Sequence, residues 1–261
     1  MELLLTNPFA YLDTFMLIFV RVGSLFILVP FLGNRSIPVI AKIAMAFFVS
    51  AIIINVMNVQ TSIPSSEPYL FALAMLKESF VGWMIGFAAY LAYTTLTLAG
   101  QFIDHQIGFS MVNVFDPLSQ VQLSITGTLY YYLVLLLTLI TNTYHYFIKG
   151  IIKSFDLIPI GAGTISTQLY NGMLGFINET FIIALQIAAP FFFVILVMDA
   201  VLALLARTAP QMDLFVIGFP LKIFLGLAVM LITINVFPMV AEIITNKSIT
   251  FIDQIIKGMM P

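Results

Sequence analysis

The chain contains six long runs of apolar residues, separated by short polar stretches. Each run has at least the about 20 mostly apolar residues that an α-helix needs to cross a bilayer. The pattern therefore predicts an all-α integral membrane protein with five to six long helices. The predicted spans are Tyr11–Leu32, Val39–Val59, Tyr69–Leu98, Ser124–Phe147, Phe176–Ala206 and Val216–Val240.

Prolines in and beside these runs predict that several of the helices are kinked or broken, because proline has no N–H to donate within a helix. They are Pro30, Pro190, Pro220 and Pro238. Two glycines spaced four apart in the third run, Gly82 and Gly86, would let helix backbones approach closely. Glycine is common in membrane helices, so this pattern is a weak signal by itself.

Two further segments have a mixed composition. The stretch Lys149–Gly172 is Gly-rich and predicts a short amphipathic helix followed by a loop. The tail, Ile243–Pro261, has apolar residues at helical spacing and predicts a short amphipathic helix. Nothing between the runs has the composition of a linker between soluble domains, so we expect a single membrane domain over residues 1–261.

The most polar stretch of the middle of the chain is Ala99–Gln122, which lies between two apolar runs. It contains Asp104, His105, two Gly, a Pro and four Gln, and it has no Lys or Arg. Irregular backbone at membrane depth is tolerated only where protein buries it or where it lines a watery cavity. The stretch therefore predicts a polar loop held inside a membrane assembly, next to whatever path the protein offers.

The composition supports membrane insertion and excludes several other classes of protein. Hydrophobic residues make up 61% of the chain and charged residues 8%, against roughly 45–50% and 25% in soluble domains. The net charge of −2 does not favour a nucleic-acid partner. The N-terminus has no basic region before its first apolar run, so we expect that run to be a retained span rather than a cleaved signal peptide.

No residue pattern in the chain predicts catalysis or a cofactor. Cysteine is absent and there are only two His, which removes thiolate metal sites, disulfides and His-rich clusters. The sequence has no HExxH, GxSxG or Walker motif. The short Gly161–Gly163 stretch is better explained as a turn than as a phosphate cradle. We therefore expect a protein that is not an enzyme and that has no cofactor.

Several charged residues fall within or beside the apolar runs: Arg21, Asp104, Asp199, Lys222 and Glu242. An isolated charge at the bilayer centre costs at least a few kcal/mol, so each should face a partner or water. Asp13 lies eight residues before Arg21 and shares its helix face loosely. Structural ion pairs between helices are the simpler explanation. A proton relay is the alternative, although Asp104-His105 is the only adjacent pair that could belong to one.

The distribution of basic residues does not fix an orientation in the membrane. With six alternating spans, the loops on one side contain five Lys or Arg and those on the other contain four, and the positive-inside rule needs a clear excess. Either the number of spans differs from six, or the chain is not inserted as a simple serpentine. The two sets are Lys77, Lys149, Lys153, Lys247 and Lys257, against Arg35, Lys42, Arg207 and Lys222.

Three blocks of residues, in order along nearly the whole chain, carry a family resemblance. They are Arg21, Pro30–Gly33, Ile37-Pro38 and Lys42; then Glu78, Gly82, Gly86, Ala99–Met111 and Asp116-Pro117; then Asp199 and Arg207–Lys222. With these blocks the chain resembles the FliR family of flagellar biosynthesis and export-gate proteins, whose injectisome counterparts form the related T family. The ending Gly218–Lys222 is closer to the flagellar branch. Asp213 departs from the family, which more often has Asn there.

The resemblance implies a fold, a location and partners. Members of the family occur as one copy in an export gate built with FliP and FliQ subunits, in the bacterial inner membrane at the flagellar basal body. The fold it implies is a FliP-like part, residues 1–170, fused to a FliQ-like helical hairpin with an amphipathic tail, residues 171–261. The implied partners are FliP-like and FliQ-like subunits, FlhB-like and FlhA-like export components, unfolded export substrates and lipid.

The resemblance also assigns roles to residues of the middle stretch. The segment 108–120 matches a plug loop that closes the export channel at rest, with residues 99–106 before it as a packed polar hinge. An apolar constriction of this kind can exclude ions by dewetting, and Met and a loop can yield to a substrate. The expected plug residues are Gly108, Phe109, Met111, Val112, Val114, Phe115, Asp116 and Pro117.

The function that follows is a non-enzymatic subunit that helps to form and seal the channel for unfolded flagellar proteins. Two alternatives are an injectisome homologue and a stand-alone ion-coupled transporter of small solutes with Asp104, His105 and Asp199 as its coupling site. Such transporters usually show inverted repeats, and no such repeat is found in this sequence. The charged and polar residues expected to serve burial or assembly are Arg21, Glu78, Asp104, Asp199, Arg207, Gln211, Asp213 and Lys222.

Overall fold

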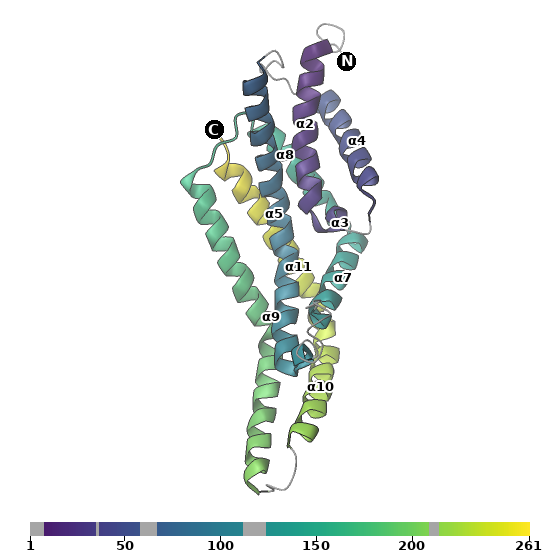
Figure 1. Ribbon diagram of the computed structural model, residues 1–261, viewed down its shortest axis with the longest axis vertical. Helices are drawn as coiled ribbons and strands as arrows, with labels where there is room; N and C mark the ends of the chain where they lie inside the picture. Colours follow the sequence, from purple (N-terminus) through teal and green to yellow (C-terminus); the bar gives the residue numbers. More distant parts are fainter. Residues whose placement is uncertain (1–7, 35–36, 58–66, 112–123, 209–213) are drawn as a thin grey trace. The chain divides into compact units, whose positions relative to one another are not determined.

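The computed structural model describes residues 8–34, 37–57, 67–111, 124–208 and 214–261, and within them it is helical with turns and no strand (Figure 1). This confirms the all-α prediction. The helices are α2 (Pro8–Leu28), α3 (Pro30–Gly33), α4 (Val39–Met57), α5 (Pro68–Ile107), η1 (Phe109–Met111), α7 (Ile125–Ile140), α8 (Tyr144–Leu157), α9 (Thr167–Thr208), α10 (Leu214–Thr233), η2 (Ile234–Val236) and α11 (Phe237–Gly258).

Five helices in the described residues are long and apolar enough to cross a membrane, and a sixth span arises if one bent pair is counted as a single span. The longest are α5 with 40 residues and α9 with 42. The number of spans therefore agrees with the five to six predicted from the sequence.

The fourth predicted span is not one straight helix. Between α7 and α8 the helix is interrupted at Thr141–Thr143. Asn142 adopts a positive φ of 55°, and the hydroxyls of Thr141 and Thr143 hydrogen-bond each other at 2.7 Å. Asn tolerates this left-handed conformation better than most residues, so a short polar sequence inside an apolar run ends the helix.

The polar stretch before the expected plug is also different from the prediction. Residues 99–106 are not a hinge: they continue α5 without a break to Ile107. Asp104 and His105 are thus helical, on the last turns of a helix that was expected to end near Leu98. The irregular backbone begins at Gly108, which has a φ of 99° that favours glycine.

The prolines act differently according to their positions. The chain leaves the helical conformation at Val29, and Pro30 is the first residue of α3, where a missing N–H has no cost. Pro238 is likewise the second residue of α11. Pro190 and Pro220 lie inside α9 and α10, which continue past them.

The described chain forms two compact units, each assembled from separate segments. The first comprises residues 1–92, 141–176 and 245–261, and the second comprises residues 93–140 and 177–244. These units do not test the predicted division into a FliP-like part and a FliQ-like part at residue 170, which concerns kinship with other subunits and stays a prediction.

In the first unit, α2 packs against α4, with the Phe15 and Phe47 rings edge to face at 5.2 Å. The C-terminal tail is fastened to the loop before α9, since Ser166 donates to the carbonyl of Gly258 at 2.6 Å. The Phe176 and Phe251 rings stack at 3.8 Å. The tail is therefore a helix, as predicted, and its apolar face is buried by its own unit.

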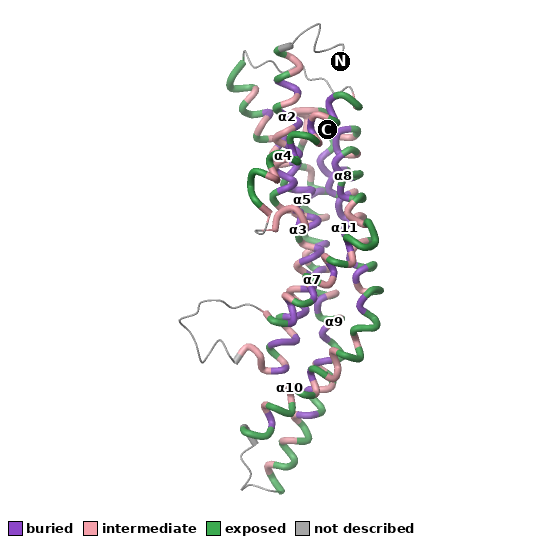
Figure 2. The backbone as a smooth tube through the Cα atoms, turned by 90° about the vertical axis from the view of Figure 1, so that its right-hand side faces the viewer, coloured by how far each residue is buried: buried purple, intermediate pink, exposed green. Residues whose placement is uncertain are grey.

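In the second unit, the end of α5 packs against α7 and α10. A Cβ added at Gly100 would come within 2.7 Å of the Thr126 carbonyl carbon, and one at Gly226 would meet the Ile107 side chain at 2.5 Å. These glycines allow close helix contact. Figure 2 shows that α10 and the C-terminal half of α9 are largely exposed, in contrast to the long buried stretch of α5.

Candidate functional site

A buried ion pair, Arg21–Glu78, connects α2 and α5 in the first unit. Arg21 Nε lies 2.5 Å from Glu78 Oε2, and Arg21 Nη2 lies 3.0 Å from Glu78 Oε1. The two side chains are 1% and 0% exposed. This fork-to-fork geometry is the strongest form of a carboxylate–guanidinium contact, and it lets two charges remain inside an apolar helix bundle.

Arg21 also holds the C-terminal end of α8. Its Nη1 donates to the Ser154 carbonyl at 3.0 Å, and Nη1 and Nη2 donate to the Ile158 carbonyl at 3.2 and 3.1 Å. The C-terminal end of a helix carries a partial negative charge, which favours a cation beside it. The guanidinium lies 4.2 Å from the centre of the Phe155 ring. Arg21 therefore ties three segments together.

Glu78 has a second role, in the turn after α8. Its Oε1 accepts a hydrogen bond from the Gly161 N–H at 2.8 Å, and the adjacent Lys77 donates to the Gly161 carbonyl at 3.2 Å. Gly161 has a φ of 76°. The Gly161–Gly163 stretch is thus a turn whose first residue is held at both backbone polar atoms.

Close contact between α2 and α5 depends on glycine. A Cβ added at Gly82 would collide with the Ser24 hydroxyl and the Arg21 carbonyl, and one at Gly86 would come within 2.9 Å of Leu28 Cβ. The two glycines of the third apolar run therefore face α2, which brings the backbone of Arg21 near α5 and its side chain within reach of Glu78.

Asp104 joins the two helices that flank residues 112–123. The carboxylate is 4% exposed; its Oδ2 accepts from the Ser124 hydroxyl at 2.7 Å, and both oxygens accept from the Thr126 N–H at 3.2 Å. An acidic group beside the first turn of a helix is stabilised by the free N–H groups there. Asp104, on the last turn of α5, thereby holds the N-terminus of α7.

The start of the expected plug contacts α10. A Cβ added at Gly108 would lie 2.9 Å from the Phe219 ring. Phe109 is half-buried and belongs to η1, as does Met111. The other expected plug residues, Val112, Val114, Phe115, Asp116 and Pro117, lie outside the described residues.

The second unit has an ion pair of its own, between α9 and α10. Lys222 Nζ lies 2.7 Å from Asp199 Oδ1, and the side chains are 27% and 46% exposed. Arg207 is exposed in the last turn of α9. Gln211 and Asp213 lie outside the described residues. The pair is thus surrounded by mainly apolar residues of these two helices.

The expected site residues form separate groups. Arg21 and Glu78 are together in the first unit, whereas Asp104 and the Asp199–Lys222 pair are in the second with different partners. His105, next to Asp104, is exposed. Over the residues that the structure describes, no three acidic or His side chains are placed to hold a metal ion.

Sequence reasoning missed the partners more than the charged residues themselves. The backbone acceptors Ser154 and Ile158 gave no signal, because any residue could supply a carbonyl. Ser124 did carry one: a Ser directly before an apolar run is typical of a helix start, and its hydroxyl accepts from the Gly127 N–H at 2.8 Å.

Comparison with known proteins gives consistent matches along most of the chain. The family model "Bacterial export proteins, family 1" matches residues 12–248. The flagellar biosynthetic protein FliR of Bacillus subtilis (strain 168) is 33% identical over 225 residues, which cover 85% of this chain and 86% of the relative. FliR of Escherichia coli (strain K12) is 28% identical over 80% of each chain.

A third relative, FliR of Aquifex aeolicus (strain VF5), is 27% identical over 86% of each chain. The family model's range, residues 12–248, includes parts of both compact units and all three blocks of residues that carry the resemblance. The chain belongs to the bacterial export proteins of family 1, together with these FliR relatives.

Proposed function

We propose that this chain is a non-enzymatic subunit of the flagellar protein-export gate, located in the bacterial cytoplasmic membrane at the flagellar basal body. The observation that carries the proposal is the match to an export family over residues 12–248, with flagellar relatives that align over most of their own length. The five membrane-capable helices fit a protein that forms part of a channel wall.

The exposed ion pair of the second unit supports assembly with other subunits. Asp199 and Lys222 neutralise each other, yet both side chains are part-exposed between helices that are otherwise apolar. Charges on a lipid-facing surface are costly, so in a membrane such a pair should face protein or water. FliP-like and FliQ-like subunits, with FlhA-like and FlhB-like components nearby, are the partners we propose.

We further propose that residues 108–120 seal the channel at rest. The described residues nearby support this proposal, because Gly108 packs on Phe219 and Asp104 holds the beginning of α7 within the same unit. A segment rich in Phe, Met and Val can exclude ions by dewetting.

The test of the gate function is complementation. Expression of the chain in a Bacillus subtilis strain that lacks FliR, with the species-matched FliP and FliQ supplied, should restore flagellin secretion and swimming. Normal membrane levels of the chain without any recovery of secretion would contradict the proposal.

The test of the seal is a separate measurement of ion leak. Replacing Phe109, Met111 and Phe115 by Ser should raise conductance through the assembled complex. Leu136→Ser, at an exposed position of α7, is the matched control and should leave conductance unchanged. An unchanged conductance in the triple variant, with assembly intact, would contradict the proposal that this segment seals the channel.

The alternative of an ion-coupled transporter finds less support. Its three expected coupling residues have separate surroundings: Asp104 is bound by Ser124 and Thr126, Asp199 is paired with Lys222, and His105 is exposed. Solute transport driven by an ion gradient, shown with the purified chain alone, would favour this alternative. The relatives reported above are flagellar proteins, which does not favour an injectisome homologue.

A further inference from the structure

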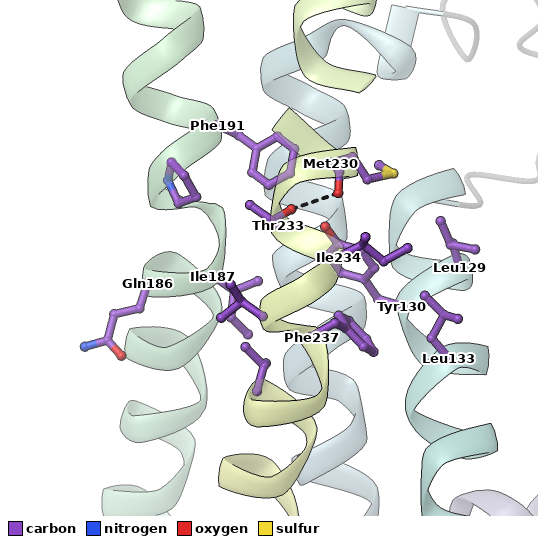
Figure 3. Close-up of a pocket in the computed structure, with 13 residues that line it drawn as sticks. Leu129, Tyr130, Leu133, Gln186, Ile187, Phe191, Met230, Thr233, Ile234 and Phe237 are labelled. Carbon is purple, nitrogen blue, oxygen red and sulfur yellow. Dashed lines mark hydrogen bonds between the residues drawn. The ribbon is translucent and has the colours of Figure 1, made fainter. Parts of the chain in front are cut away.

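The second unit contains an apolar cavity of about 270 Å³ between α7, α9 and the junction of α10 with α11 (Figure 3). Its floor is formed by aromatic side chains that are almost fully buried, and its rim by exposed aliphatic ones. The residues that carry the argument are Tyr130, Phe191 and Phe237 on the floor and Leu129, Ile234 and Val236 at the rim.

A proline in one helix and a 3₁₀ turn in another lie at the cavity. Pro190, inside α9, has no N–H to donate to the carbonyl of Gln186, and a proline ring fits poorly against the preceding helical turn. Opposite it, the helix tightens into the 3₁₀ turn η2 at Ile234–Val236. Two well-packed regular helices would leave no space of this size.

The cavity offers few polar side chains to a guest. Thr233 Oγ1 donates to the Met230 carbonyl at 3.1 Å, and the other lining residues, apart from Tyr130 and Gln186, have apolar side chains. The Gln186 side chain points away from the other lining residues (Figure 3). A polar guest would lose its hydrogen bonds to water and find none here, which selects for an apolar occupant.

We propose that this cavity binds a phospholipid acyl chain from the surrounding membrane. Ile234 and Val236 lie in a stretch, Val216–Gly258, that is long and apolar enough to cross a bilayer. The neighbouring Leu231 and Ile232 are exposed, so the mouth opens on an apolar surface of this unit. In a membrane, acyl chains are the apolar molecules at hand for such a surface. This inference does not depend on the proposed export function.

The size of the cavity favours a flexible chain over a single side chain. An engineered cavity of about 150 Å³ lined by Leu, Ile and Phe takes up benzene, which is the size of a Phe ring. A Phe from a partner subunit would leave much of the 270 Å³ unfilled. An acyl chain can bend and follow an irregular volume, so it can contact both the floor and the rim.

The experiment uses the full-length chain with its co-expressed partner subunits, reconstituted in vesicles of phosphatidylethanolamine and phosphatidylglycerol. The probe is phosphatidylethanolamine with a photoactivatable diazirine in its acyl chain, and labelled peptides are located by mass spectrometry. We expect labelling at Ile187 and Ile234, quantified relative to the exposed reference position Leu231.

A filling variant and a matched control separate the cavity from bulk lipid. Leu133→Trp places a large ring in the cavity and should lower the labelling ratio at Ile187 and Ile234 several-fold. Leu136→Trp, three residues further on the same helix and exposed rather than lining the cavity, should leave the ratio unchanged. If Leu133→Trp does not accumulate, Val240→Phe fills the cavity from α11 instead.

Two results would overturn the proposal. One is a labelling ratio that the filling variants do not change, which would mean that the probe reports only lipid at the surface. The other is the absence of lipid label at Ile187 and Ile234, together with crosslinks to a partner subunit from a photoactivatable amino acid placed at these positions. That outcome would assign the cavity to a protein side chain.

Discussion

One interhelical ion pair in each compact unit provides a direct comparison, because the two pairs differ in exposure. In the first, Arg21 and Glu78 are enclosed by their own unit, and the guanidinium also satisfies the carbonyls of α8. In the second, Lys222 and Asp199 are paired at a similar distance but remain part-exposed on apolar helices. One pair is complete within the chain, whereas the other depends on whatever lies against α9 and α10.

This difference indicates which polar and apolar groups find their partners within the folded chain and which depend on molecules around it. The first unit supplies its own partners for its buried charges. The second has an open apolar cavity and an exposed ion pair, and both features call for an outside occupant, lipid for the first and protein or water for the second. Loss of the Arg21–Glu78 pair should thus act on the isolated chain, and loss of the Asp199–Lys222 pair mainly on the chain in its assembly.

The largest effect is expected from Glu78→Ala. Removing one partner of a buried pair leaves an uncompensated charge and destabilises by about 3–5 kcal/mol, so the chain should be recovered from membranes in much lower amounts. Yield and thermal unfolding midpoint in mild detergent measure this. The matched control is Glu67→Ala, at an exposed position near the start of the same helix. Equal recovery of the two variants would contradict a central role of the ion pair.

The next effect concerns glycines that allow backbone contact. A methyl group at Gly82 or Gly100 would overlap neighbouring backbone atoms, and overpacking of this kind typically costs about 1–3 kcal/mol. Gly175→Ala, on α9 with open space around it, should instead stabilise by about 1 kcal/mol through helix propensity. Thermal midpoints that fall for the first two and rise for the third would support this packing, and a uniform shift would oppose it.

Asp104 and Asp199 provide the direct contrast within the second unit. Asp104→Ala leaves the Thr126 N–H and the Ser124 hydroxyl without their acceptor and should cost about 1–3 kcal/mol in the isolated chain. Asp199→Ala removes a part-exposed pair and should cost less than about 1 kcal/mol there. In the assembled complex the second variant should show the larger change in subunit recovery. A similar small effect of Asp199→Ala in both settings would argue against a covered ion pair.

The smallest effect is expected at Lys153–Asp253, which joins α8 and α11 in the first unit at 2.8 Å with both side chains part-exposed. Lys153→Met should shift stability by less than about 1 kcal/mol. The shift should vanish in high salt because exposed pairs are screened. Thermal midpoints at low and high salt measure it, and a large salt-independent loss would show that exposure does not distinguish the two ion pairs of this unit.

Much of the fold was predictable from the apolar runs, because membrane helices leave long, continuous signals. The departures have local causes. Asn142 can adopt a positive φ, which allowed the interruption between α7 and α8 inside a single apolar run. Conversely, residues 99–106 are polar but remain helical. The helices α7 and α10 pack on that end of α5, and the Asp104 carboxylate accepts a hydrogen bond from the Thr126 N–H at the start of α7.

The candidate site was predictable in its charged residues but not in their pairing. Arg21, Asp104, Asp199 and Lys222 stand out in any apolar run, whereas the partner of Arg21 is 57 residues away on another helix. Gly82 and Gly86 gave a hint of the α2–α5 contact that makes this pair possible. The cavity could not be predicted, since it arises where Pro190 and the η2 turn meet in space.

The most direct test of the account is the composition of the particle that contains this chain. Purified in mild detergent after co-expression with FliP-like and FliQ-like subunits, a tagged chain should elute as one stable hetero-oligomer, and native mass spectrometry should find both other subunits in it. The Asp199→Ala variant should lower their recovery. A monodisperse monomer or homodimer under the same conditions, with no FliP-like or FliQ-like subunit retained, would contradict the claim that this protein is completed by its assembly.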